Sequence, residues 1–233
     1  MALGETQRRL LLDVMAVGGA WPLLLAGGQA AELHGLARHG GAGLELVTDA
    51  QTPMAELASA LRAGLEARGR QVRELAMAPL EARLEVTDPA GGAPCPVGLR
   101  KETLWRPPVP GPCGPVLAVE DLVGIRVREL ADRGTPACLV DVRAAARHRP
   151  VAELEELGRR HAQDGLELAE LQARLEGVEW LDDREFAARG LDPEQIAGLR
   201  AWAQGWADDI GERLAEEAPY EEPPDEEPAD EDV

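Results

Sequence analysis

A short stretch of the chain, HGLARHGGAGLELVTDA at residues 34–50, has the spacing of a metal-binding strand. Gly43 and Glu45 lie two residues apart, so in a strand they face one side, while Leu44 and Leu46 face the other. Carboxylates at two such positions can hold Mg²⁺ against a phosphate. Here only one of the two positions carries a carboxylate.

A pair of glycines, Gly27 and Gly28, ends the apolar segment LLLA and precedes a helical pattern. Glycines at such a turn let the backbone approach a phosphate, and carboxylates on the neighbouring strand would hold the metal. A third carboxylate from a later strand usually completes such a site. The arrangement is suited to a nucleoside triphosphate, although a Gly-Gly pair is also common at an ordinary strand-to-helix turn.

The first half of the chain reads as strands and helices in alternation. Thr52 before Pro53 predicts the N-cap of a helix that extends to about Arg68. The segments ARLEVTD and PVGLR, separated by a glycine-rich turn, predict a hairpin, and the proline cluster WRPPVPGPCGP predicts a rigid connector. Periodicity predicts the other elements: helices over 5–17 and 29–36, and strands over 23–26, GLELVTD and QVRELAMA.

The second half of the chain reads as helices only. VEDLVGIRVRELADR carries an apolar stripe, with Arg126 and Arg133 on one side of it. The sequence Asp192-Pro-Glu-Gln195 predicts a capped start for the last helix, whose Trp202 and Trp206 should face the core. Further helices are expected near 139–147, 151–163, 167–176 and 182–189.

The expected fold class is α+β, a small mixed-sheet core followed by a helical bundle. We divide the chain into an α/β core at 1–114, a helical region at 115–215 and a disordered acidic tail at 216–233. The formal net charge is −19, and the tail holds ten acidic residues and no basic one. A solvated tail is the default expectation, although it could also bind a basic partner or mask the chain's own arginines.

Composition also indicates where the protein is expected to be found in the cell. No apolar run approaches the roughly 18 residues that span a bilayer, so no membrane association is expected. Glu5 and Asp13 argue against a secretory signal, and the expected location is cytoplasmic. The three widely spaced cysteines predict buried thiols rather than a disulfide framework or a zinc site.

These motifs together resemble the AbiEii/AbiGii-type nucleotidyltransferase toxin family of the DNA polymerase β-like superfamily. The resemblance covers nearly all of residues 5–215 and is carried by LLLAGGQAAELHG, GLELVTD, PVGLRKETLWRPP, EDLVGIRVRELADRG, LVDVRAA, WLDDREFAARGLD and WAQGWADDI. It implies a nucleotidyltransferase core with a helical region. In active members it implies transfer of a nucleotide from an NTP to an acceptor, often a transfer RNA.

The resemblance also implies which residues form the site. Gly27 and Gly28 match the family's glycine pair, and with Gln29, Arg126 and Arg133 they are the expected nucleotide-binding residues. Gly43, Glu45 and Gly98 stand where active members have three aspartates. Arg126 stands at the position of a lysine, Ala137-Cys138 replace an Arg-Asp pair, and Asp141 is retained.

The expected function is therefore nucleotide, RNA or protein binding by a catalytically impaired member of the family, because nucleotidyl transfer depends on metal charge. The alternative is an active enzyme that uses Mg²⁺ and a rearranged carboxylate set centred on Glu45, its one candidate catalytic and metal-binding residue. Asp49, Glu85 and Asp88 could serve in that set. The expected partners are an NTP, an RNA or a cognate antitoxin-like protein.

Several of these residues also have simpler interpretations. Glu45 could be a solvated strand residue, and Arg126 and Arg133 could form ion pairs with Glu129 along one helix. His34 and His39 have no partner at ligand spacing, so they are expected to be surface or packing histidines.

Overall fold

A computed structural model describes residues 3–36, 43–162 and 165–217 of the chain. The strands in this part are β1 (Leu24–Ala26), β2 (Leu44–Thr48), β3 (Gln71–Met77), β4 (Glu81–Thr87), β5 (Cys95–Lys101), β6 (Val109–Gly111) and β7 (Gly114–Val116). The α-helices are α1 (Glu5–Val17), α2 (Gly27–Leu33), α3 (Met54–Glu66), α4 (Val119–Arg133), α5 (Pro136–Ala145), α6 (Val151–His161), α7 (Leu168–Glu176), α8 (Asp183–Ala187) and α9 (Pro193–Glu217). A 3₁₀ helix, η1 (Gly177–Trp180), follows α7.

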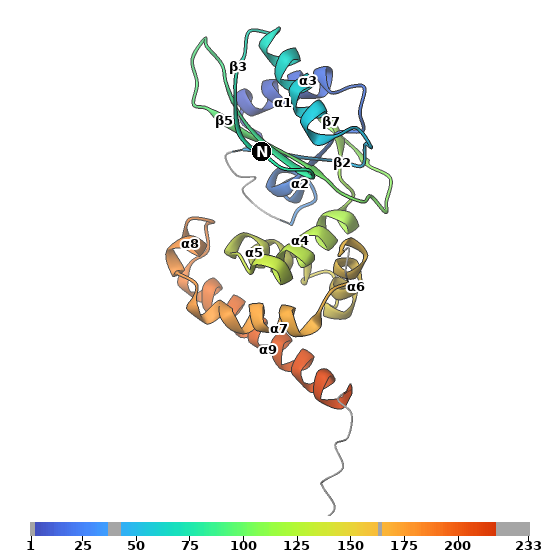
Figure 1. The fold of residues 1–233 in the computed structure, drawn as a ribbon. Coiled ribbons are helices and arrows are strands. Elements are labelled where there is room, and N and C mark those ends of the chain that lie inside the picture. Colours follow the sequence, from blue (N-terminus) through green and yellow to red (C-terminus); the bar gives the residue numbers. More distant parts are fainter. Residues whose placement is uncertain (1–2, 37–42, 163–164, 218–233) are drawn as a thin grey trace, which may run out of the picture.

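The strands form one mixed sheet of seven, in the order β3-β4-β5-β2-β1-β7-β6. β2 runs antiparallel to β1 and parallel to β5. In Figure 1, α1 and α3 cover one face of the sheet, while α2 and the helical region lie on the other side. The expected α+β class, with a mixed sheet followed by helices, is confirmed.

The alternation in β2 separates the two faces of the sheet. Leu44 and Leu46 are buried in the core beneath α1 and α3, and Glu45 between them is exposed on the opposite face. β4 follows the same rule, with Ala82, Leu84 and Val86 buried. β4 and β5 pair antiparallel, so the hairpin predicted from ARLEVTD and PVGLR is confirmed.

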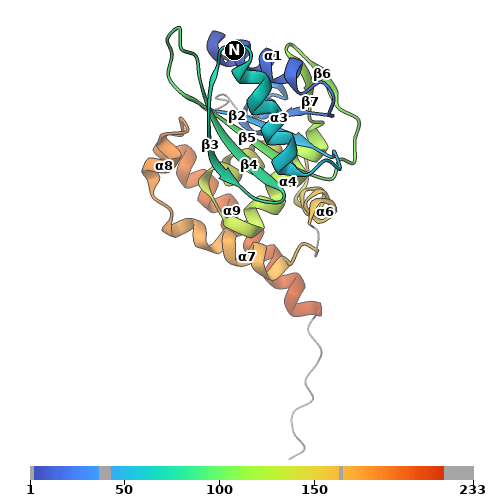
Figure 2. The same cartoon turned by 45° about the horizontal axis from the view of Figure 1, so that its top comes forward.

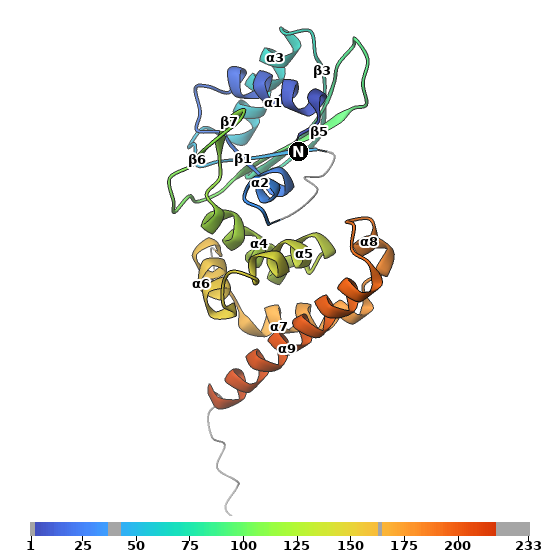
Figure 3. The same cartoon turned by 180° about the vertical axis from the view of Figure 1, so that it is seen from behind.

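The helical region is arranged around α4, which packs against α5, α6 and α7. Figure 3, the view from behind, shows α9 crossing in front of α7. The predicted start of α9 is confirmed, because Asp192 and Gln195 cap each other: Gln195 N donates to Asp192 Oδ1 at 2.8 Å and Asp192 N donates to Gln195 Oε1 at 3.0 Å. Trp206 is buried and Trp202 is half-buried against the same core.

Two local predictions were wrong. α3 begins at Met54 with Pro53 as its N-cap, and the Thr52 hydroxyl instead accepts a hydrogen bond from Trp21 Nε1 at 3.1 Å. The proline-rich connector contains a short hairpin, β6 and β7, because Pro110 and Pro115 face each other in register at an edge of the sheet, where a missing N–H is tolerated.

The division at residue 114 and the character of the acidic tail stay predictions. The last strand ends at Val116, and Glu216 and Glu217 belong to α9 rather than to a separate tail. The rest of the tail and His39 lie outside the described residues. Among the described residues, no helix is long and apolar enough to cross a membrane. Figure 2, tilted from Figure 1, shows the helical region below the sheet.

Candidate functional site

A cleft of about 420 Å³ lies between the sheet and α4. It is lined from β1, β2, β4 and β5 on one side and from α4 on the other. Five of the residues that the sequence analysis singled out line it together: Gly27, Gly43, Glu45, Gly98 and Arg126. The strand order brings these residues together. β2 has β1 and β5 as its two neighbours, so the start of α2 and the middle of β5 both lie beside Glu45.

The backbone around Glu45 is held closely. Glu45 pairs directly with Gly98 in the parallel register of β2 and β5. Gly27 has a φ of +64°, and a Cβ on it would come within 2.2 Å of Glu45 Oε2. Glycine is therefore required at position 27, both for the left-handed backbone and for the space that the Glu45 carboxylate occupies.

Arg126 of α4 reaches from the helical region to this carboxylate. Its Nη2 donates to Glu45 Oε2 at 3.3 Å and its Nη1 donates to Glu129 Oε2 at 2.6 Å. Its Nε lies 3.0 Å from Asp141 Oδ2 but without the geometry of a hydrogen bond. Burial alone would lower the pKa of Arg126, but these three carboxylates outweigh burial and raise it well above its ordinary value.

Glu129 and Arg100 join the same charge network and were not singled out as site residues. Arg100 Nη1 also donates to Glu129. Burial alone would raise the pKa of Glu129, but the charges of Arg126 and Arg100 outweigh burial and lower it to about 2. A sequence signal existed for each: Glu129 lies three residues after Arg126 on the helix, and Arg100 lies two residues after Gly98 on the strand.

Asp141 and Cys138 lie on the buried side of this charge network, next to Arg126 and Glu129. Burial raises the pKa of Asp141, and the charge of Arg126 lowers it by less. Cys138 lies at the first turn of α5, where the Thr135 hydroxyl donates to its Sγ at 3.2 Å. Burial and the charge of Glu129 raise the pKa of the Cys138 thiol to about 11, so the thiol is protonated at neutral pH and is a poor nucleophile.

Three other expected nucleotide-binding residues do not line the cleft. Gly28 lies in the first turn of α2, and Gln29 is buried with its side-chain amide donating to the Gly43 carbonyl. Arg133 is exposed at the end of α4 and lines a second hollow of about 980 Å³. Arg126 forms the predicted ion pair with Glu129, and Arg133 forms none within the described residues.

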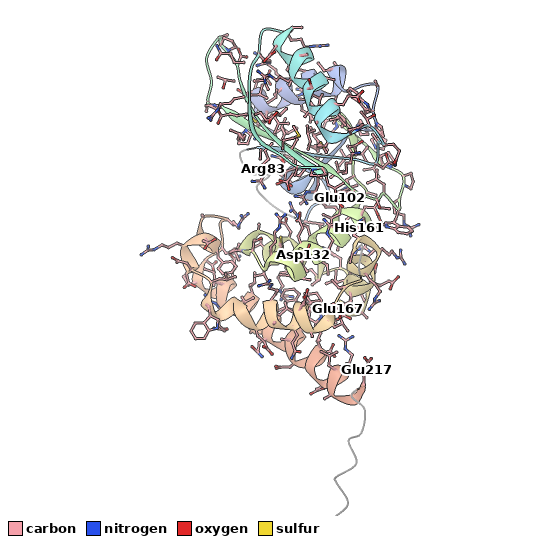
Figure 4. All side chains as sticks on the ribbon, viewed as in Figure 1. Arg83, Glu102, Asp132, His161, Glu167 and Glu217 are labelled. Atoms are coloured by element: carbon pink, nitrogen blue, oxygen red, sulfur yellow. The ribbon has the colours of Figure 1, made fainter. Side chains whose placement is uncertain are left out.

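The second hollow lies where the ends of β2 and β5 meet α4. Within it, Arg128 forms two hydrogen bonds with the buried Glu102 carboxylate, each of 2.8 Å. Figure 4 labels Glu102 and His161 close together here, with Asp132 further along α4. His161 is itself buried and lies 3.2 Å from Asp121 Oδ1. His34 packs as expected, donating from Nε2 to the Leu117 carbonyl at 2.8 Å.

The alternative carboxylates do not lie in the cleft. Asp49 lines the second hollow, Glu85 pairs with Arg73 on the exposed face of β4, and Asp88 pairs with Arg70. None of the three belongs to the described lining around Glu45. A rearranged metal site built from these residues would therefore need a different local structure.

The residues of the cleft do not fit a divalent metal ion. Mg²⁺ requires several oxygen ligands in near-octahedral geometry, and Glu45 has glycines at the two neighbouring ligand positions. The other acidic groups nearby pair with arginines instead: Glu129 and Asp141 with Arg126, and Glu81 with Arg83. Across the residues that the structure describes, no group of three or more His, Cys, Asp or Glu side chains is placed to hold a metal ion.

Neither a protein-family model nor the sequence of a curated protein matches this chain. The solved structures that are similar to it include three that are each 14% identical in sequence. A candidate nucleotidyltransferase from H. pylori has a TM-score of 0.53 over 94% of this chain and 100% of its own.

The second is JHP933 from Helicobacter pylori, with a TM-score of 0.51 over 92% of this chain and 95% of its own. The third is MenT4, a nucleotidyltransferase toxin from Mycobacterium tuberculosis H37Rv, with a TM-score of 0.50 over 91% of this chain and 94% of its own. At this identity the likeness concerns the fold. The chain has the nucleotidyltransferase fold found in these proteins.

Proposed function

We propose that this chain is an AbiEii toxin-like member of the nucleotidyltransferase superfamily that is impaired in nucleotide transfer and acts through ligand binding in the cleft. The observation that carries the proposal is the ion pair between Arg126 and Glu45. Glu45 is the one carboxylate among the three positions where active members have aspartates, and the Arg126 guanidinium is paired with it at Oε2.

The charges around this pair argue against transfer. Nucleotidyl transfer requires cations that neutralise the triphosphate as charge moves in the transition state. Here two of the three cleft arginines, Arg100 and Arg126, are engaged by Glu129, whose pKa of about 2 keeps it charged at neutral pH. A metal ion at Glu45 would have to displace a guanidinium and then find its remaining ligands elsewhere.

The second candidate function is an active, Mg²⁺-dependent transferase. One observation favours it: the Glu45 side chain is 51% exposed, so one carboxylate still faces the cleft. In that case Glu45 would be the residue that holds the ion, and the ion would neutralise the phosphates of the NTP. The acceptor would be an RNA or a protein.

A transfer assay separates the two candidates. The full chain is incubated with each α-³²P-labelled NTP, Mg²⁺ or Mn²⁺, and total RNA or cell extract, and labelled products are resolved by electrophoresis. We expect no labelled product from the wild-type chain or from Glu45→Gln. Labelling by the wild-type chain that Glu45→Gln abolishes would overturn the impaired function and establish the active transferase.

The similarity to MenT4, a nucleotidyltransferase toxin, supports a toxin-related setting for this chain as part of the proposal. In such a setting the partner would be an NTP, an RNA or a cognate antitoxin-like protein. Affinity purification of the tagged chain from its native host, followed by mass spectrometry and RNA sequencing, tests this point. Recovery of the chain alone under gentle conditions would contradict a stable protein or RNA partner.

A further inference from the structure

Two arginines at the end of α5 carry charge that no carboxylate compensates. Arg143 lies in the last turn of α5 and Arg147 in the turn that follows, and within the described residues neither forms an ion pair. Burial and the charge of Arg147 lower the pKa of Arg143, whereas neighbouring carboxylates raise the pKa of the cleft arginines Arg100 and Arg126. In a chain of net charge −19, this pair is open to an anion.

Trp202 of α9 adds an aromatic surface beside the pair. The Arg143 guanidinium lies over the Trp202 ring, 5.2 Å from its centroid. Stacking uses the flat face of the guanidinium and leaves its in-plane N–H groups free to donate to carboxylates. Trp202 is half-buried, so part of the indole is open to a further apolar contact, and proline-rich segments bind to aromatic side chains in this way. The surface therefore fits a ligand that has both carboxylates and proline rings.

The chain itself contains a segment of this composition. Residues 218–233 hold eight acidic side chains, four prolines and no basic residue, and they follow Glu217, the last residue of α9. Trp202 lies about 22 Å back from Glu217 along this continuous helix, at 1.5 Å per residue (Figure 3). A proline-rich segment of this length spans up to about 50 Å at 3.1 Å per residue. Its middle can therefore reach Arg143 and Arg147.

The path back along α9 offers this segment no nearer free cation. Arg213 is the one basic residue between Trp202 and Glu217. It is already paired with Glu155 at 2.6 Å and with Asp209 at 3.2 Å. The Glu155 side chain is buried, so releasing Arg213 from it would leave a buried carboxylate without its guanidinium. An acidic segment that returns along this helix therefore meets its first unpaired arginine beside Trp202.

We propose that residues 218–233 fold back on their own molecule and bind Arg143 and Arg147 through the carboxylates of residues 225–227, with a proline against Trp202. Because the two partners belong to one chain, an effective concentration in the millimolar range allows even a weak contact to form. The segment then acts as a built-in competitor that keeps other anions from the arginine pair. Neither the pair nor Trp202 lines the cleft, so the inference holds or fails independently of the proposed function.

Paramagnetic broadening in the full chain tests this contact. A nitroxide is attached through Ala229→Cys, because the three native cysteines are buried, and the parent chain carried through the same labelling controls for reaction at those cysteines. At low salt we expect the Nε1–H signal of Trp202 to lose most of its intensity. Trp21, whose Nε1–H is bonded to Thr52 in the α/β core, should keep its intensity. About 1 M NaCl, where the Debye length is about 3 Å, should restore the Trp202 signal.

Variants locate the contact at the arginine pair. Arg143→Gln combined with Arg147→Gln should remove the selective broadening while the chain stays folded by circular dichroism. The matched control is Arg159→Gln combined with Arg160→Gln, because these exposed arginines of α6 are both paired with Glu156. This control should leave the broadening unchanged. Replacing the eight acidic residues of the segment by their amides should remove the broadening as fully as the first variant does.

Four outcomes would overturn the inference. Absence of selective broadening at low salt would show that the segment does not return to this surface. Broadening that persists in the Arg143→Gln, Arg147→Gln chain would show that the pair is not its binding site. Broadening in a mixture of isotope-labelled chain without nitroxide and unlabelled chain with it would assign the contact to a second copy. Binding of a fluorescent oligouridylate that only this double variant loses, without any broadening, would assign the pair to a nucleic acid.

Discussion

At the scale of single residues, Gly43 and Gly98, the two glycines that the family resemblance aligns with metal-binding aspartates, are not equivalent. A Cβ at Gly98 would meet nothing closer than 3.9 Å, whereas a Cβ at Gly43 would lie 2.8 Å from the Pro96 carbonyl oxygen. At position 98 only the side chain is missing. At position 43 the backbone of β5, at Pro96, occupies the space that a side chain would need.

Restoring a carboxylate at Gly98 should therefore create metal affinity. Gly98→Asp places a second carboxylate beside Glu45 in register, and we expect Mn²⁺ to raise the Tm of this variant. At 100 times the dissociation constant the gain would be about 2.7 kcal/mol, a shift of several degrees for a chain of this size. Gly98→Asn is the control without the charge; an equal Mn²⁺ shift in Gly98→Asn would contradict the explanation.

The same geometry predicts different stabilities for two alanine variants. Gly43→Ala forces a shift of backbone against backbone and should lower the free energy of unfolding by about 1–3 kcal/mol. Gly98→Ala meets open space and should change it far less. Urea unfolding followed by circular dichroism measures both, and similar losses in the two variants would show that the closure at position 43 is not a constraint.

Glu129 predicts how stability depends on pH. Its pKa falls from 4.5 to about 2 in the folded chain, so its contribution is complete above pH 5 and is lost as pH falls toward 2. The contribution is roughly 3 kcal/mol, and protonation of Asp141, whose pKa is raised, offsets part of the loss. Unfolding free energies from pH 7 to pH 3 should fall less steeply in Glu129→Gln than in the wild type. The exposed Glu66→Gln is the control.

At the scale of elements, most strands and helices were predictable because their apolar periodicity is local. The bounds of α1 match those expected, and β2 and β4 alternate as expected. Tertiary contacts decided the rest: Thr52 is engaged by Trp21, which lies 31 residues away, and the β6–β7 hairpin is formed across prolines. Within the site, motifs pointed to the glycines and to Arg126, which line the cleft, while the spacing of Arg100 two residues after Gly98 was a signal that the motifs did not use.

The reciprocal cap of α9 gives a prediction for an element. Asp192→Ala removes the acceptor for the Gln195 N–H and should lower the free energy of unfolding by about 1 kcal/mol. Asp192→Asn keeps an acceptor and should cost a few tenths of that. Chemical denaturation of the three proteins at neutral pH checks the order, and equal losses in both variants would indicate that charge rather than capping stabilises this end.

At the scale of the whole molecule, two hydrophobic clusters meet at α4, through apolar as well as charged side chains. One cluster surrounds the sheet with α1, α2 and α3 and includes Leu122 and Ile125 of α4, the other lies among the helices from α4 to α9, and Leu36 packs against both. Three ion pairs connect the sheet side to α4: Glu45 with Arg126, Arg100 with Glu129, and Glu102 with Arg128. The first two line the cleft, so part of the charged junction between the sheet and α4 is also a wall of the candidate site.

The pair of Glu102 and Arg128 tests how strongly this junction couples the two cores. The Glu102 side chain is 4% exposed, so Arg128→Met would leave a buried carboxylate with only the Arg100 guanidinium, 3.7 Å away, and should cost about 3 kcal/mol. Glu102→Leu combined with Arg128→Met removes both charges and should recover much of that loss. Urea unfolding monitored by tryptophan fluorescence and by circular dichroism measures both variants.

The second part of this prediction concerns whether the fluorescence and circular dichroism unfolding curves coincide. If the junction couples the cores, the two signals should coincide in the wild type and in the double variant, and separate in Arg128→Met. Coincident signals in all three proteins would mean that apolar contacts alone make the two cores one cooperative unit. In that case the Glu102–Arg128 pair would contribute to stability without coupling the two cores, because its removal would leave cooperativity unchanged.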